Sequence, residues 1–418
     1  MKRVGSRVSA ELTAATSTTA MMSAAEIMAY KPSKGLFDQR LVALFGPAGS
    51  GKTRLLLEIA KLSGNTLCLA PTHYLKRSCS QDFRHVWTVA KAALSPKRAF
   101  QPFRTVMITE AAMVRDLEIT LILRKLASGT RLYLDCDPYQ ISAITDAATK
   151  PIIDSSSFKQ LLGRPTTLCV RMTEQFRTRN LMVMAVIDAI QQQNKSNLLE
   201  SLMALILHCR TDIANVPYND EDIVVAHTNA IRNYVWEKVC VERNLQPELN
   251  TNLVLGHQVR LLVTKKQPAK PGSRKKQIVY ANGDMCTLLE VSAKHVRVQL
   301  DDETEHKVPH LPDGSPAVSQ TGCLTAYATQ GMTASGHVYV VCDTPSLPPP
   351  ICISTLYVML TRARTHNRDG PPDNLHFVVH NWPRFRDALS AKIMGSPFSP
   401  FQQEFCRLLY AHSKANSE

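Results

Sequence analysis

The feature that most constrains this chain is a glycine-rich loop between a short apolar run and a helical stretch. The run LVALF, residues 41–45, leads into GPAGSGKT, residues 46–53, and RLLLEIAKL follows. Glycines let backbone N–H groups curl around phosphate oxygens, and the amino end of the next helix favours negative charge. The pattern therefore predicts a strand, a phosphate-binding loop and a helix, and with them nucleotide binding.

The residue types in this loop match the chemistry of a nucleoside triphosphate. Lys52 is expected to reach the β- and γ-phosphates, and Thr53 is expected to bind Mg²⁺ through its hydroxyl. The expected cofactors are therefore Mg²⁺ and a nucleoside triphosphate, since P-loop kinases, GTPases and motors share this loop. The predicted nucleotide contacts in the loop are Gly46, Pro47, Ala48, Gly49, Ser50, Gly51, Lys52 and Thr53.

Short apolar runs alternate with helical stretches along most of the chain, which predicts an α/β fold with parallel sheets. From residue 256 to residue 316 the runs become short and β-like, with turn signals at Asn282-Gly283 and Asp313-Gly314, which predict a small β-barrel. The first 35 residues favour a disordered tail over a transit peptide. The expected order is a flexible tail at 1–38, a first lobe at 39–165, a second lobe at 166–255 and 317–390, the inserted barrel at 256–316, and a C-terminal helical tail at 391–418.

The net charge and the cysteines indicate which kinds of partner and which cellular compartment to expect. Lys plus Arg number 49 against 35 Asp plus Glu, a formal charge of +14, and nucleic acid is the commonest polyanionic partner of such a chain. The basic run at 265–276 is expected to be a solvated loop, with a nucleic-acid contact or a nuclear-import signal as the alternative. The 11 cysteines include no C-x-x-C pair, which predicts an intracellular, reducing compartment. Nucleus, cytoplasm and viral replication site stay open.

From Leu41 to Arg364 the chain resembles the superfamily 1 helicases, especially the RecD-like and PIF-like group, because eight further segments follow the phosphate loop in that family's order. Four segments lie in the first part: TLCLAPTHYLKRS with Pro71 and Thr72, VWTVAKAAL with Thr88, VMITEAAM with Glu110, and LYLDCDPYQISAI with Asp137 and Gln140. The later ones are LCVRMTEQFRT with Arg177, VVAHTNAIRNYV with Thr228 and Asn229, LTAYATQGMTASGHVYVV with Thr325, Gln330 and Gly331, and LYVMLTRART with Arg362.

The resemblance implies two RecA-like P-loop NTPase lobes, with the small β-barrel inserted in the second. It implies that Glu110 polarises the attacking water and that Arg177 and Arg362 reach the γ-phosphate from the second lobe. The implied catalytic set is Lys52, Glu110, Gln140, Arg177 and Arg362; the implied metal ligands are Thr53 and Asp137. Gly331 joins the nucleotide contacts, and the implied nucleic-acid contacts are Pro71, Thr72, Thr88, Thr325 and Gln330.

The sequence departs from the family at several places. Thr109 stands where an Asp usually precedes Glu110, and a neutral hydroxyl there should weaken Mg²⁺ binding, so either Asp137 or Asp135 compensates or hydrolysis is slow. Residues 94–104 leave little room for a strand-splitting pin, so translocation is expected to survive more readily than unwinding, unless the barrel supplies the wedge. Tyr327 replaces a common His, and no adenine-reading Gln precedes the phosphate loop.

The expected function is that of an ATP-dependent helicase or translocase on single-stranded nucleic acid, with DNA favoured over RNA. The TRAR sequence at 361–364 favours the DNA-acting group, in which movement is usually 5′ to 3′. The alternatives are a catalytically weakened nucleic-acid-binding P-loop protein and a viral-type RNA helicase. The expected partners are single-stranded DNA or RNA and replication-complex proteins, without a membrane, since no apolar run is long enough to cross one.

Overall fold

The computed structural model separates the chain into two compact units. Unit 1 comprises Met1–His208, Cys352–Asn374 and Leu389–Glu418, and unit 2 comprises Cys209–Ile351 and Leu375–Ala388. The structure describes residues 10–13, 40–143, 150–162, 167–172, 175–216, 221–248, 251–268, 276–280, 282, 284–300, 302–346, 351–395, 398, 402–403 and 406–407.

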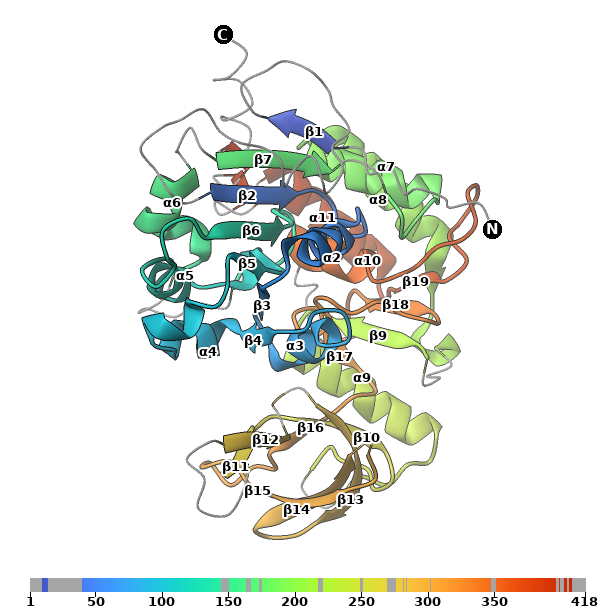
Figure 1. Ribbon diagram of the computed structural model, residues 1–418. Coiled ribbons are helices and arrows are strands. Elements are labelled where there is room, and N and C mark those ends of the chain that lie inside the picture. Colours follow the sequence, from blue (N-terminus) through green and yellow to red (C-terminus); the bar gives the residue numbers. More distant parts are fainter. Residues whose placement is uncertain are drawn as a thin grey trace, which may run out of the picture. The chain divides into compact units, whose positions relative to one another are not determined.

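Unit 1 contains a seven-stranded sheet in the order β1-β7-β2-β6-β5-β3-β4, which Figure 1 shows as a stack of arrows. Its strands are β1 (Ala10–Thr13), β2 (Arg40–Phe45), β3 (Thr66–Ala70), β4 (Val86–Thr88), β5 (Thr105–Ile108), β6 (Arg131–Cys136) and β7 (Thr167–Met172). Every pair is parallel except β1 with β7. The central strands are apolar and buried throughout, as in sheets that are covered on both faces.

Helices cover both faces of this sheet, because strand side chains alternate between two cores. Val42 and Leu44 pack against Leu56 in one core, whereas Ala43 and Phe45 belong to the opposite core. The helices of this part are α2 (Lys52–Ser63), α3 (His73–Cys79), α4 (Val89–Leu94), α5 (Asp116–Leu123), α6 (Ser156–Leu162), α7 (Leu181–Gln191), α8 (Lys195–Cys209) and α10 (Ile353–Leu360). Short 3₁₀ turns occur at Lys97–Phe100, Ala111–Met113 and Ile152–Asp154.

Unit 2 contains a five-stranded parallel sheet in the order β17-β9-β18-β19-β8. Its elements are β8 (Arg210–Thr211), a 3₁₀ turn at Ile213–Asn215, β9 (Ile223–Ala226), α9 (Asn229–Glu242), β17 (Leu324–Thr325), β18 (Val338–Val341) and β19 (Leu375–Val378). Helix α11 (Trp382–Gly395) follows β19. The sheet buries its apolar side chains with Val235 and Trp236 of α9. The predicted α/β class is therefore confirmed for both parts of the chain.

An antiparallel sheet interrupts unit 2, in the order β15-β14-β13-β10-β16. Its strands are β10 (Gln258–Leu261), β13 (Met285–Val291), β14 (His295–Leu300), β15 (Glu305–Pro309) and β16 (Val318–Gln320), and β11 (Lys265–Pro268) pairs separately with β12 (Lys276–Tyr280). Alternate residues such as Leu288, Val296 and Val308 form its core. Among the described residues no ladder joins β15 to β16, so the predicted closure into a barrel is not confirmed.

Several elements cross the predicted boundaries. Residues 10–13 pair with β7, although they fall within the predicted tail at 1–38. The first lobe does not end at residue 165, because β7 pairs with β2 and completes the first sheet beside the phosphate loop. Helix α11 runs across the boundary predicted at residue 391, because its apolar face is continuous. The centre of the basic run, 269–275, lies outside the described residues, while both its ends are strands.

Membrane insertion has no candidate segment in the part of the chain that the structure describes. No helix there combines the length and the apolar character that a membrane span needs.

Candidate nucleotide-hydrolysis site

The phosphate loop connects β2 to α2, in the strand–loop–helix context that the sequence predicted. Two positions in it require glycine. A Cβ on Gly46 would lie 2.3 Å from the backbone oxygen of Met172, and a Cβ on Gly49 would lie 2.6 Å from Cβ of Arg177. Gly49 also has a positive φ of 86°, which side chains disfavour. The sequence of the loop therefore follows from how closely β7 and the segment after it approach the loop.

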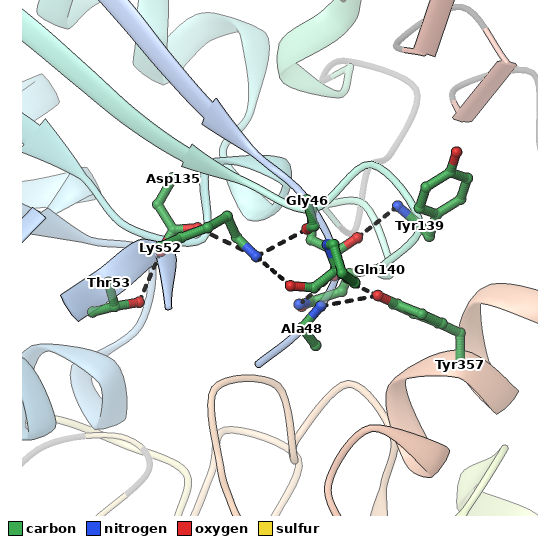
Figure 2. Close-up of polar contacts among 10 residues, drawn as sticks. Gly46, Ala48, Lys52, Thr53, Asp135, Tyr139, Gln140 and Tyr357 are labelled. Atoms are coloured by element: carbon green, nitrogen blue, oxygen red, sulfur yellow. Dashed lines mark hydrogen bonds and ion pairs between the residues drawn. The ribbon is translucent and has the colours of Figure 1, made fainter. Parts of the chain in front are cut away.

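Lys52 is held over the loop by its own backbone, as Figure 2 shows. Its Nζ donates to the carbonyl oxygens of Gly46 and Pro47, each at 2.9 Å, and the residue is only 6% exposed. The same Nζ lies 4.0 Å from Oδ1 of Asp135. A desolvated ammonium in this position is ready to exchange backbone carbonyls for the stronger acceptor that a phosphate provides.

Thr53 and Asp135 form the second polar contact at the amino end of α2. The Thr53 Oγ1 donates to Asp135 Oδ2 at 2.8 Å. Burial raises the pKa of Asp135, while Lys52 and the hydrogen bond from Thr53 oppose that rise. The predicted metal ligand Thr53 is therefore hydrogen-bonded to the carboxylate of Asp135.

Asp137, a predicted metal ligand, is hydrogen-bonded within the protein. It is fully buried and accepts three hydrogen bonds: from Tyr139 N to Oδ1 at 3.1 Å, and from Gln140 Nε2 and Tyr357 hydroxyl to Oδ2 at 3.2 and 2.8 Å. Both of its oxygens thus serve protein donors, and metal binding by Asp137 stays a prediction. Asp137 instead joins the loop after β6 to α10.

Tyr357 is the residue of this site that sequence reasoning missed. Its hydroxyl accepts from Ala48 N at 3.0 Å and donates to Asp137, so it bridges the phosphate loop and the loop after β6 (Figure 2). Burial and Asp137 raise the pKa of Tyr357 well above its usual value, which keeps the hydroxyl protonated. The run LYVML reads as ordinary buried helix, and its single hydroxyl is the one signal that could have marked it.

Glu110 lies just beyond β5, with a left-handed backbone at φ 47° and ψ 49°. Non-glycine residues adopt this conformation rarely, and they cluster at functional sites when they do. Burial first, and then Asp135, raise the pKa of Glu110 to about 7, while Lys52 and Arg362 act in the opposite direction. Its carboxyl group is thus placed and tuned as a proton acceptor would be.

Two arginines meet next to Glu110. Arg362 is 1% exposed and donates from Nε to Val358 O at 2.9 Å, and Arg177 Nη1 donates to Thr361 O at 2.8 Å. Burial first, and then the charge of Arg177, lower the pKa of Arg362 to about 10, whereas Glu110 raises it. These cations therefore share one desolvated region with the acid.

Both arginines belong to unit 1, the unit that contains the phosphate loop, and not to a separate second lobe as predicted. The physical reason is local anchoring. Phe176 N donates to Gly49 O at 2.9 Å, which holds the segment with Arg177 against the phosphate loop, and Tyr357 holds α10 there.

The residues predicted to touch nucleic acid are spread over both units. Thr72 and Thr88 cap α3 and α4 by accepting from Leu75 N and Lys91 N, each at 3.2 Å, and Pro71 directly precedes this cap. Thr325 lies in β17 of unit 2 and accepts from Ala328 N at 3.4 Å. Their contacts with a strand stay predictions.

Burial separates these residues. Thr88 and Gln330 are 7% and 3% exposed, so their side chains serve the packing in this structure, whereas Pro71, Thr72 and Thr325 are partly exposed. Gly331 lies in the turn after Gln330, with a positive φ of 81°, and its contact with a nucleotide also stays a prediction. Thr228 caps α9, directly before Asn229, by accepting from Ile231 N.

Comparison with known proteins places this geometry in a known fold. A family model described as an AAA domain matches residues 36–205. Pif1 of Bacteroides bound to single-stranded DNA has a TM-score of 0.57 and 17% identity, over 85% of this chain and 94% of that chain. The same helicase with ADP-AlF3 and single-stranded DNA has a TM-score of 0.56 and 17% identity, over 86% and 95%.

A third structure, of two coordinating Pif1 helicases in unwinding at forked double-stranded DNA, has a TM-score of 0.56 and 16% identity, over 85% of this chain and 94% of that chain. No curated protein matches the chain. At these identities the likeness establishes a shared fold, and the predicted resemblance to the PIF-like group of superfamily 1 helicases is confirmed at that level.

Proposed function

We propose that this chain, which has the fold of the Pif1 helicases and their order of motifs, hydrolyses ATP to move along single-stranded nucleic acid. The observation that carries the proposal is the meeting of four charged groups at one loop. Lys52, Glu110, Arg177 and Arg362 come from four distant segments, and unit 1 brings them together. A simple nucleotide-binding protein would have no need of two buried arginines beside a phosphate loop.

Phosphoryl transfer needs positioning and charge more than covalent chemistry, and these residues supply both. Lys52 binds the β- and γ-phosphates, and Arg177 and Arg362 neutralise the charge that develops as the terminal phosphate leaves. Glu110 accepts the proton of the attacking water. Mg²⁺, when bound, neutralises phosphate charge, and Thr53 and its carboxylate partner fit it, because hydroxyl and carboxylate oxygens are its preferred ligands.

Movement requires that nucleotide state and strand binding depend on each other. Tyr357 is suited to this coupling, since its hydroxyl occupies the amide of Ala48 and also holds Asp137. When a phosphate accepts from the Ala48 amide, the hydrogen bond from that amide to the Tyr357 hydroxyl breaks and α10 is released. Pro71, Thr72 and Thr325 are the proposed strand contacts, with Gly331 as a nucleotide contact from unit 2.

The finer features are part of the same proposal. We propose that DNA is favoured over RNA, because the Pif1 structures with this fold are bound to single-stranded DNA. A reducing compartment is supported by the cysteines, all of which lie in the described part of the chain and none of which forms a disulfide. Replication-complex proteins are proposed partners, and two RecA-like lobes with a small inserted barrel are the proposed architecture.

A weakened, strand-binding protein is the second candidate, because Thr109 replaces the usual acid. ATP turnover measured without nucleic acid, with single-stranded DNA and with single-stranded RNA separates the two. We expect stimulation by a single strand, and more of it by DNA. Absence of turnover with every metal and strand, together with normal strand binding, would overturn the motor and leave the passive binder.

The affinity for a single strand should depend on the salt concentration. A chain of formal charge +14 that neutralises several phosphates releases counterions, so log affinity should fall with log salt by roughly 0.7 for each phosphate contacted on a single strand. Fluorescence anisotropy with a labelled oligonucleotide at several salt concentrations measures this slope. A flat titration would contradict the proposed phosphate contacts.

A further inference from the structure

We propose that the carboxylate that serves Mg²⁺ has moved by one strand, from position 109 on β5 to Asp135 on β6. The inference rests on the proposed function, since it takes Mg²⁺ with ATP as the ligand of the phosphate loop. It explains why an acid is missing before Glu110 without implying that the metal site is lost.

Strand register places the two positions side by side. Ile108 of β5 pairs with Leu134 of β6, so the next residues in register are Thr109 and Asp135. On its other side β6 pairs with β2, the strand that leads into the phosphate loop, and there Asp135 is opposite Leu44. Neighbouring strands are about 4.8 Å apart, so Asp135 is one strand spacing closer to the loop than residue 109.

The oxygens of Asp135 are arranged for a ligand from outside the protein. Oδ2 accepts from the hydroxyl of Thr53 at 2.8 Å, and this Thr is the residue whose hydroxyl binds Mg²⁺ in P-loop sites. Oδ1 is buried and has no hydrogen-bond partner among the described residues, with Lys52 Nζ at 4.0 Å. A buried carboxylate oxygen without a partner is costly, and a cation beside Thr53 would remove that cost.

Thr109 is engaged elsewhere. Its hydroxyl is 3.4 Å from the backbone oxygen of Leu69, to which its own N–H also donates at 3.0 Å, so the residue is turned towards β3. A carboxylate at 109 would stand next to Asp135 in a buried region and repel it. An acid at position 135 therefore requires a neutral residue at position 109.

Asp137 does not compete for this role, because its oxygens accept from Tyr139, Gln140 and Tyr357. Nor does the site need more protein ligands. The described residues contain no group of three or more His, Cys, Asp or Glu able to hold a metal by themselves. Mg²⁺ at nucleotide sites is held by one or two side chains together with phosphate oxygens and water. Thr53 and Asp135 can supply these side-chain ligands.

The test measures how much Mg²⁺ tightens nucleotide binding, with a fluorescent ATP analogue titrated in Mg²⁺ and in EDTA. We expect Asp135→Asn to reduce the Mg²⁺-dependent gain in affinity by about 10- to 100-fold and to leave the affinity in EDTA nearly unchanged. Thr109→Val should keep the full gain. The double exchange Thr109→Asp with Asp135→Asn should recover part of it, and Mn²⁺ in place of Mg²⁺ gives a direct paramagnetic readout of bound metal.

The outcomes are distinct. A Mg²⁺-dependent gain that persists in Asp135→Asn would overturn this inference and leave the proposed function standing. Absence of nucleotide binding by the wild type in any condition would overturn both. If Asp135→Asn does not fold, Asp135→Glu serves instead: it keeps the charge on a longer stem, and we expect a several-fold smaller gain, whereas an unchanged gain would count against the site.

Discussion

Both units contain a parallel sheet with aspartates at or just after the ends of strands, yet these aspartates are used in different ways. In unit 2, Asp343 follows β18 and accepts from His380 N at 2.6 Å and Asn381 N at 3.0 Å, so it fixes the turn before α11. In unit 1, Asp137 accepts three hydrogen bonds, whereas Asp135 keeps one buried oxygen without a partner among the described residues. A carboxylate whose two oxygens both accept hydrogen bonds stabilises the fold, whereas one with an oxygen that lacks a partner is available for a ligand.

The carboxyl edges of the two sheets, where the parallel strands end, also differ in charge. In unit 1 the edge gathers Lys52, Glu110 and Arg362 in one desolvated region. In unit 2 the edge after β9 carries His227, whose pKa burial lowers to about 4, and Thr228, which caps α9. The ends of the strands thus gather charged groups in one unit and packing groups in the other, and substitutions at the two edges should differ accordingly.

The largest expected effect belongs to the charged edge. Lys52→Ala should reduce ATP turnover by more than about 100-fold, because no neutral side chain can offset the phosphate charge. Steady-state turnover at matched ATP concentration measures it. Lys61→Ala on the same helix is the matched control, since Lys61 is exposed and pairs with Glu58 of that helix. Unchanged turnover in Lys52→Ala would remove the nucleotide site.

At the packed edge, the largest effect should be on stability. Asp343→Asn should lower the free energy of unfolding by about 2 to 4 kcal/mol, because two partly buried hydrogen bonds lose a charged acceptor. Asp135→Asn should lower it by less than about 1 kcal/mol, since that carboxylate is desolvated and only partly paired. Urea denaturation compares the two. Equal losses would show that pairing does not distinguish these acids, and the exposed Asp387→Asn provides the baseline.

His227 should make the stability of unit 2 depend on pH. Its pKa is lowered from 6.5 to about 4 by burial, and its Nε2 has no hydrogen-bond partner among the described residues. Below pH 6.5 the unfolded chain binds a proton that the folded unit refuses, so stability present above 6.5 is lost as the pH falls towards 4. The loss should reach up to about 3 kcal/mol.

Denaturation of the wild type and of His227→Gln between pH 7 and pH 4.5 measures this loss. The variant should show a shallower dependence on pH than the wild type. Parallel curves would mean that other groups control the acid sensitivity. His257→Gln is a suitable control, because His257 is a partly exposed histidine of the same unit.

Tyr357→Phe should give the smallest effect, and it probes the link within the charged edge. Asp137 keeps two donors, so the free energy of unfolding should fall by only about 1 kcal/mol. The Ala48 amide becomes available, and ATP should bind up to about fivefold more tightly, the equivalent of 1 kcal/mol. Stimulation of turnover by a strand should fall at the same time.

Separate measurements of KM and kcat, with and without single-stranded DNA, distinguish coupling from stability. A purely structural role for Tyr357 would change stability and leave both the ATP affinity and the stimulation as in the wild type.

The sequence by itself determined the phosphate loop and the order of the motifs, because eight consecutive residues specify how a backbone encloses a phosphate. It also showed that Thr109 breaks the pattern, and it favoured Asp137 over Asp135 as the metal ligand. Only the tertiary structure decided between them, because strand register and the approach of Tyr357 depend on residues far apart in the chain. The same long-range packing placed β7 in the first sheet and both arginines in unit 1, since pairing partners and helix contacts are not written in any local run.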